Sequence, residues 1–138
     1  MKTTKISYLL ALSSFAIAMV YAVVNSFVNY ETVVGTFDKL GYPPYLIFVN
    51  GAAQLIGLAV LILNKNNWMT EWAYAGFFMN FIFGIIAHLM AKEGNGAAAV
   101  LCIILLWLTY VQGKRMHEQK GLEQEAITET NNALRSIA

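Results

Sequence analysis

Five polar side chains lie within long apolar stretches of this chain, and their types could do chemistry in a membrane: Asn25, Asn50, Gln54, Asn80 and His88. An imidazole beside amides can hydrogen-bond a carbonyl or pass a proton, because imidazole titrates near neutral pH. The set therefore predicts a ligand-binding pocket for a quinone-like head group or another small amphipathic molecule. The alternative is hydrogen bonding between helices, which contributes about 0.6 kcal/mol per bond without any ligand.

His88 also belongs to a stripe of small and polar residues. Gly76, Asn80, Gly84 and His88 follow each other at intervals of four residues, which places them on one face of a helix. Small residues on such a face allow a second helix to approach closely, and polar ones offer it hydrogen bonds. Because Asn50 and His88 fall at similar depth in successive helices, the predicted pocket opens toward the outer leaflet.

The elements that position these residues are four stretches without Asp, Glu, Lys or Arg, at 6–30, 40–64, 72–91 and 94–113. Each reaches the roughly 20 residues that a helix needs to cross a bilayer. The apolar run of the first stretch continues through Val28 without a polar break, so we interpret it as a membrane helix and not a cleaved signal peptide. We therefore predict an all-α membrane protein, an antiparallel bundle of four transmembrane helices. The predicted spans are 6–28, 45–63, 72–91 and 97–113 in a domain of residues 1–113, with a polar cytoplasmic tail at 114–138.

Composition excludes several classes of protein. The hydrophobic fraction is 58% and the charged fraction 12%, while the net charge of +1 gives no signal for nucleic-acid binding. A single cysteine, Cys102, excludes an intrachain disulfide and is expected to be a small packing residue. No carboxylate lies within a span, which argues against a metal site or ion coupling, and no catalytic motif is present. We expect no enzymatic activity of the chain by itself.

The distribution of Lys and Arg predicts that both termini are cytoplasmic. Lys65, Lys114 and Arg115 would lie on the inner side with Lys2, Lys5 and Lys120, whereas the outer loops hold only Lys39 and Lys92. The aromatic residues fit the same orientation, because amphipathic rings favour the depth of the head groups. Those expected at the inner interface are Tyr8, Trp68, Trp72, Trp107 and Tyr110, and those expected at the outer one are Tyr30, Tyr42 and Tyr45.

Two segments outside the spans carry local signals. Apolar residues at helical spacing in 31–40 predict a short helix on the outer interface, which Gly41 ends and Pro43 cannot continue. An ordered loop is the alternative. Glu71 is expected in the first turn of the third span, where the helix dipole favours a carboxylate, with Thr70 as N-cap. Docking of a cytoplasmic partner is the alternative role for Glu71.

Two further expectations concern large apolar side chains and the tail. Phe77, Phe78, Phe81 and Phe83 are expected to face lipid and not a cofactor. Residues 114–138 have only weak helical spacing of apolar residues, so the tail is expected to be a frayed helix or a disordered segment that orders on a partner.

The segments 37–46 and 71–77, with Gly51 and Gly57 between them and Ala87-His88 after them, resemble the DoxX-like family of small four-helix membrane proteins. The resemblance implies a bundle in a bacterial cytoplasmic (inner) membrane. It also implies a link to redox chemistry, since relatives include membrane subunits of thiosulfate:quinone oxidoreduction and of oxidative-stress complexes. Relatives often carry an acidic residue where this chain has Asn25-Ser26. The residues that carry the structural motif here are Gly41, Tyr42, Pro43, Glu71, Trp72, Gly76 and Gly84.

The sequence thus predicts a redox-linked membrane subunit whose outer polar residues bind a quinone-like molecule or a partner protein. A membrane scaffold or assembly protein without a ligand is the second hypothesis. A small-molecule permease ranks last, because the spans contain neither a broken helix nor a charged pathway. The lipid bilayer is the one certain partner, and the sequence leaves the oligomeric state open.

Overall fold

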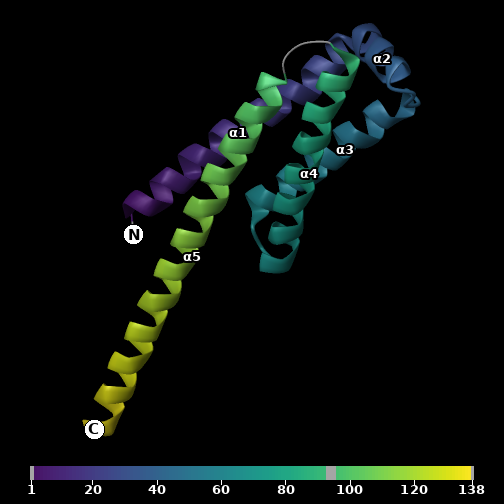
Figure 1. The fold of residues 1–138 in the computed structure, drawn as a ribbon. Helices are drawn as coiled ribbons and strands as arrows, with labels where there is room; N and C mark the ends of the chain where they lie inside the picture. Colours follow the sequence, from purple (N-terminus) through teal and green to yellow (C-terminus); the bar gives the residue numbers. More distant parts are fainter. Residues whose placement is uncertain (1, 93–95, 138) are drawn as a thin grey trace.

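The computed structural model describes residues 2–92 and 96–137, and it is helical throughout (Figure 1). Its helices are α1 (Lys2–Val28), α2 (Tyr30–Lys39), α3 (Tyr45–Leu63), α4 (Asn67–Ala91) and α5 (Ala97–Ile137). Four of them, α1, α3, α4 and α5, are long and apolar enough to cross a membrane. The prediction of an all-α chain with four long apolar helices is therefore confirmed.

A single buried stripe runs along each long helix. On α1 the buried residues follow steps of four, three, four and four, at Tyr8, Leu12, Phe15, Met19 and Val23. Steps of three and four residues keep one face of a helix, which we call its seam, toward the neighbouring helices. On the other helices the buried residues are three, four or seven positions apart, which also keeps them on one face: Ile47, Gly51, Leu58 and Leu61 on α3, Tyr74, Phe77 and Phe81 on α4, and Leu106, Thr109, Gly113 and Met116 on α5.

The four seams meet around Phe15. Helix α1 packs against α3 and α5, and α4 packs against the same two helices. The fully buried Phe15 ring meets the rings of Phe77 and Phe81 edge-on, with centroids 5.2 and 6.2 Å away. The expectation that Phe77 and Phe81 face lipid is therefore wrong, whereas Phe78 and Phe83 are exposed. Helix α4 is apolar on all sides, so its composition does not show which face is buried.

Helix α2 confirms that residues 31–40 form a short helix, and its end has a defined motif. The Tyr42 N–H donates to the Phe37 carbonyl at 2.9 Å, and the Gly41 N–H donates to the Asp38 carbonyl at 3.1 Å. Gly41 has a φ of 74°, and the Phe37 and Tyr42 rings are in contact, with centroids 6.2 Å apart. These two bonds, the left-handed glycine and the apolar contact define a Schellman motif, which stops α2 ahead of Pro43.

Helix α4 begins five residues earlier than the predicted span. Its N-cap is Asn66, whose side-chain oxygen accepts from the Trp68 N–H at 3.0 Å. The expectation that Thr70 is the N-cap is wrong, because Thr70 already lies inside the helix and its hydroxyl donates to the Asn66 carbonyl at 3.0 Å. Glu71 consequently lies in the second turn. The extended backbone of Asn66 gives its short amide the geometry that a cap requires.

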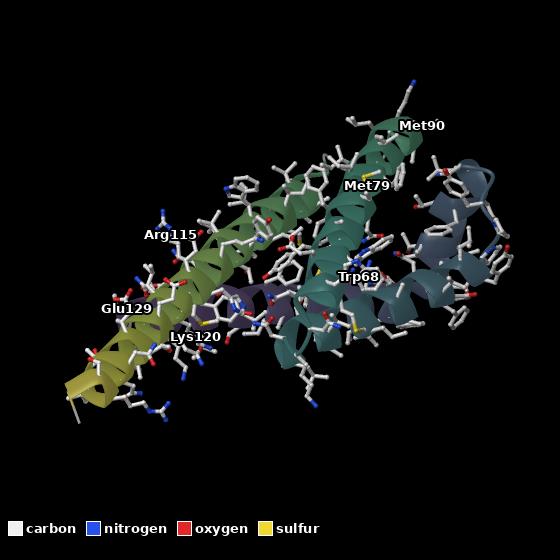
Figure 2. The ribbon with its side chains drawn as sticks, turned by 90° about the horizontal axis from the view of Figure 1, so that it is seen from below. Trp68, Met79, Met90, Arg115, Lys120 and Glu129 are labelled. Carbon is white, nitrogen blue, oxygen red and sulfur yellow. The ribbon has the colours of Figure 1, made fainter. Side chains whose placement is uncertain are left out.

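Helix α5 passes the predicted boundary at residue 113 without a break and is 41 residues long. Its C-terminal part extends alone past the ends of the other helices (Figure 1), and residues 117–136 are exposed. Figure 2 shows charged side chains, including Arg115, Lys120 and Glu129, around this part. The segment is rich in Glu, Gln, Lys and Ala and lacks proline, so its residues favour a helix even where packing does not.

The Schellman motif predicts different results for two glycines in the same region. Gly41→Ala should destabilise the end of α2 by about 1 kcal/mol or more, because an alanine is strained at positive φ. Gly35→Ala is the matched control, since Gly35 is helical and a Cβ there would meet nothing within 4 Å. The measurement is amide hydrogen exchange of α2 in detergent micelles. Equal exchange in both variants would contradict the assigned motif.

The close contact between α3 and α4 gives a second prediction. A Cβ on Gly57 would lie 3.0 Å from Cε2 of Phe77, whose ring is also in contact with the buried Phe15. Gly57→Ala should therefore lower the free energy of unfolding by about 1–3 kcal/mol through overpacking. Gly76→Ala is the control, because a Cβ at Gly76 meets nothing within 4 Å. Thermal unfolding in detergent measures both, and a larger loss for Gly76→Ala would indicate an unseen contact on that face.

Candidate functional site

The structure does not join the predicted polar residues into one pocket. Asn25 is exposed and its side-chain oxygen accepts from Asn29 Nδ2 at 2.9 Å, while Asn50 is also exposed. Gln54 and Asn80 are half-buried, and within the described residues no hydrogen bond joins any two of these four amides. The positions of these residues around their helices explain why the side chains do not meet. Asn25 points roughly opposite the α1 seam, and Asn50 precedes the seam residue Gly51 by one position.

The predicted stripe on α4 meets a neighbouring helix only toward its C-terminal end. A Cβ on Gly84 would lie 3.9 Å from the Cβ of Ala99 on α5, and one on Gly96 would lie 3.8 Å from the Cβ of His88. The imidazole of His88 itself is exposed. Gly76, at the other end of the stripe, has nothing within 4 Å of its Cβ position. The stripe therefore provides close approach to α5 only near Gly84 and His88.

A cavity of about 410 Å³ lies at the other end of the bundle, where α1, α4 and α5 meet the connection between α3 and α4. We call it the aromatic cavity. Five of its twelve lining residues are Trp or Tyr, and six others carry polar or charged side chains. The lining residues are Tyr8, Trp68, Trp72, Tyr74 and Tyr110, with Asn64, Asn67, Thr70, Glu71, Gly113, Lys114 and His117.

Two buried tyrosines form the inner wall of the aromatic cavity. Tyr8 on α1 and Tyr74 on α4 both lie on their seams, and both come within 4 Å of the position that a Cβ on Gly113 would take. Tyr8 can reach this position because Gly113 on α5 has no side chain, and a Cβ there would lie 3.3 Å from Tyr8 Cε2. The Tyr110 ring packs edge-on against Tyr74, with centroids 5.1 Å apart. Three helices thus position the aromatic rings of this inner wall.

An ion pair crosses the aromatic cavity from α4 to α5. Lys114 Nζ lies 2.6 Å from Glu71 Oε1, and the two side chains are 51% and 45% exposed. The same ammonium lies 5.4 Å from the centroid of the Tyr110 ring, over its face. Exposed ion pairs contribute little to stability, so the main effect of this pair is to hold two opposite charges at the cavity wall. Glu71 therefore contacts α5 and is not an N-terminal residue of its helix.

The connection between α3 and α4 closes another side of the aromatic cavity. Asn64 ends α3 in the left-handed conformation, with a φ of 43°. Its side-chain oxygen accepts from the Thr70 hydroxyl at 3.3 Å, and its Nδ2 lies 3.3 Å from His117 Nε2, within hydrogen-bonding distance. His117 lies beyond the predicted end of the fourth span. The polar connection thus contacts α5 at the point where α5 leaves the other helices.

The aromatic cavity combines a carboxylate, an ammonium, an imidazole and several ring faces in a space of suitable size for a small ligand. Within residues 2–92 and 96–137, no three His, Cys, Asp or Glu side chains are grouped as metal ligands would be. Sequence reasoning placed Tyr8, Trp68, Trp72 and Tyr110 at one interface, and the structure brings them around one cavity. It did not pair Glu71 with Lys114, although both were placed at that same end.

The described chain therefore defines a helical membrane protein with four helices of spanning length. Residues 10–111 match the model of the DoxX-like family, and the chain belongs to this family, as the resemblance predicted. No curated protein and no solved structure matches the chain. Tyr8, Gly113, Lys114 and His117 lie outside the matched segment, so the family match does not account for the whole of the aromatic cavity.

The ion pair of the aromatic cavity can be tested with a double-mutant cycle. Glu71→Gln and Lys114→Met should each change stability only slightly, with a coupling energy of about 0.2–1 kcal/mol, because both groups are half-exposed. The coupling should fall in high salt. Chemical denaturation in detergent measures the free energy of unfolding of the parent, the two single variants and the double variant. Glu71→Gln with Lys120→Met is the control pair and should be additive; a coupling in that pair as large as in the first would contradict a specific contact.

Proposed function

We propose that this DoxX-like protein is a non-catalytic membrane subunit that associates with a partner membrane protein through polar residues of its outer half. The four spanning helices would alternate in direction across a bacterial cytoplasmic membrane, as an antiparallel bundle, with α2 along the outer interface. Family membership and the four long apolar helices support the membrane location. The short connections of the described chain support the alternating directions, since neighbouring helices joined by few residues pack side by side.

Charge supports the proposed orientation. Lys65, Lys114 and Arg115 flank the end of the bundle that carries the aromatic cavity, together with Lys5 near the start of α1. The opposite end, which carries α2, holds Lys39 and Lys92. An excess of Lys and Arg favours the cytoplasmic side, so the cavity would face the cytoplasm and α2 the outside.

One observation carries the proposed association: Asn50 is exposed on α3 and has no hydrogen-bond partner within the described chain. In hydrocarbon an unpaired amide is costly, since no water is present to satisfy it. A helix of another protein that offers a polar side chain at the same depth would pair it. Asn25 is also exposed, on α1, but its side-chain oxygen already accepts from Asn29 Nδ2. This argument favours a partner over a scaffold that contacts only lipid.

A quinone-like molecule is the second candidate for the same surface. Its carbonyl oxygens could accept a hydrogen bond from the Asn50 amide, and Gln54 lies one turn further along α3, half-buried beside the seam. Redox-linked relatives support this candidate only by resemblance. We rank it second because Asn25 and Asn50 are exposed on the outside of the bundle, which suits a second protein surface better than an enclosed small ligand.

The association is tested by native mass spectrometry of protein extracted from its own membrane in mild detergent. The parent should carry a second protein or a second copy of the chain, and Asn50→Leu should lose it. Ala53→Leu is the matched control, because Ala53 is also exposed on α3 and the change adds similar apolar bulk. A parent that is monomeric and free of other proteins would contradict the proposal, and a quinone lost with Asn50→Leu would support the second candidate instead.

The proposed orientation predicts on which side of the membrane the C-terminus lies. A reporter fused after Ala138 should be active only in a form that works in the cytoplasm, because the Lys and Arg excess lies at that end of the bundle. Paired fluorescent-protein and alkaline-phosphatase fusions in a bacterial host measure this directly. A phosphatase fusion inserted after Asp38 is the control and should be active, since α2 is placed outside. Phosphatase activity of the C-terminal fusion would reverse the proposed orientation.

A further inference from the structure

We propose that the aromatic cavity binds the head group of a zwitterionic phospholipid with a primary amine, phosphatidylethanolamine. The site differs from the outer polar surface of the proposed function and lies at the opposite end of the bundle. Three features of the cavity support this ligand: its depth in the bilayer, its pair of opposite charges and its shape.

The depth of the cavity follows from its tryptophans. Trp68 and Trp72 line it, are 68% and 66% exposed, and contact each other with ring centroids 5.5 Å apart. Tyr110 and Trp107 continue this aromatic group on α5, with centroids 6.3 Å apart. Exposed tryptophan and tyrosine rings favour the level of the head groups in a membrane protein. The cavity therefore opens at the depth where lipid head groups lie.

The charges of the cavity match a zwitterion better than a simple ion. Glu71 offers a carboxylate and Lys114 an ammonium, both half-exposed and side by side. An anionic head group would be attracted by Lys114 but repelled by Glu71. A cationic head group would be attracted by Glu71 but repelled by Lys114. A zwitterion can place its ammonium against Glu71 and its phosphate against Lys114, with His117 adding a donor for the phosphate.

The amine is expected to be primary because of the acceptors that the cavity presents. A primary ammonium can donate hydrogen bonds to the Glu71 carboxylate, whereas the quaternary ammonium of a choline head group cannot. Lys114 already lies over the face of the Tyr110 ring, which shows that this ring is open to a cation. A ligand ammonium could occupy the same position when Lys114 turns toward the phosphate.

The shape of the cavity suits a head group that is still attached to its lipid. Its volume of about 410 Å³ is at the lower end of the range for small-ligand pockets and exceeds the needs of an ethanolamine phosphate alone. The inner wall, formed by the buried Tyr8 and Tyr74 rings, is apolar. The remaining space would hold the glycerol and the first carbons of the acyl chains against these rings.

The test is a lipid titration of the full-length protein in detergent, followed by native mass spectrometry. Phosphatidylethanolamine, phosphatidylcholine and phosphatidylglycerol with identical acyl chains are compared. We expect the parent to retain phosphatidylethanolamine several-fold better than the other two. Glu71→Gln should reduce this preference about tenfold, because it removes a charged hydrogen-bond acceptor. Lys114→Met should weaken binding of phosphatidylethanolamine, whereas Lys114→Arg keeps the charge and should retain it.

Matched control variants test whether lipid binding depends on the cavity or only on the overall charge of α5. Glu118→Gln and Lys120→Met change exposed charges on the same helix outside the cavity, and both should bind like the parent (Lys120 is labelled in Figure 2). Soluble phosphoethanolamine that competes with the lipid would show that the head group alone is recognised; failure to compete would show that the attached lipid is required. Equal retention of all three lipids by the parent, or an unchanged preference in a folded Glu71→Gln protein, would overturn the proposal.

Discussion

The contact of Phe15 with Phe77 and Phe81 holds the centre of the bundle, and the seams of the other helices are arranged around it. Lipid chains are as apolar as these side chains, so burial from water cannot drive one membrane helix onto another. Close packing must supply the association instead, which requires shapes that fit. Gly57 and Gly113 provide that fit, because each lies against an aromatic ring that a side chain would displace.

The secondary structure of this chain was largely predictable, but its packing was not. Four charge-free stretches and the turn at Gly41-Tyr42-Pro43 predicted the helices, because hydropathy and turn chemistry are local properties. The family was predicted by the resemblance of segments 37–46 and 71–77. The seam could not be identified on helices that are apolar all round, and Phe77 and Phe81 were therefore assigned to lipid. The start of α4 was missed for a different reason, since Asn66 and Thr70 are both acceptable caps and only the backbone geometry decides between them.

The candidate sites, too, were predictable only in part from the sequence. Polar residues inside a span stand out in a sequence, which drew attention to Asn50 and His88, yet the sequence does not reveal whether such a residue points at a neighbour or away from it. The aromatic cavity depends on residues near helix ends that are far apart in the chain. Glu71 and Lys114 were each placed correctly at the same end, but a single sequence carries no signal that the two side chains meet.

The length of α5 has a mechanical consequence. At about 1.5 Å per residue, the part of α5 that follows the contact of His117 with Asn64 is about 30 Å long, and it has no proline that could act as a hinge. Such a helix would act as a rigid lever with its base at His117. A tilt of about 10° at that base would move the far end by about 5 Å, by simple geometry over that length. A small change in the packing near His117 would therefore be enlarged at the far end of α5.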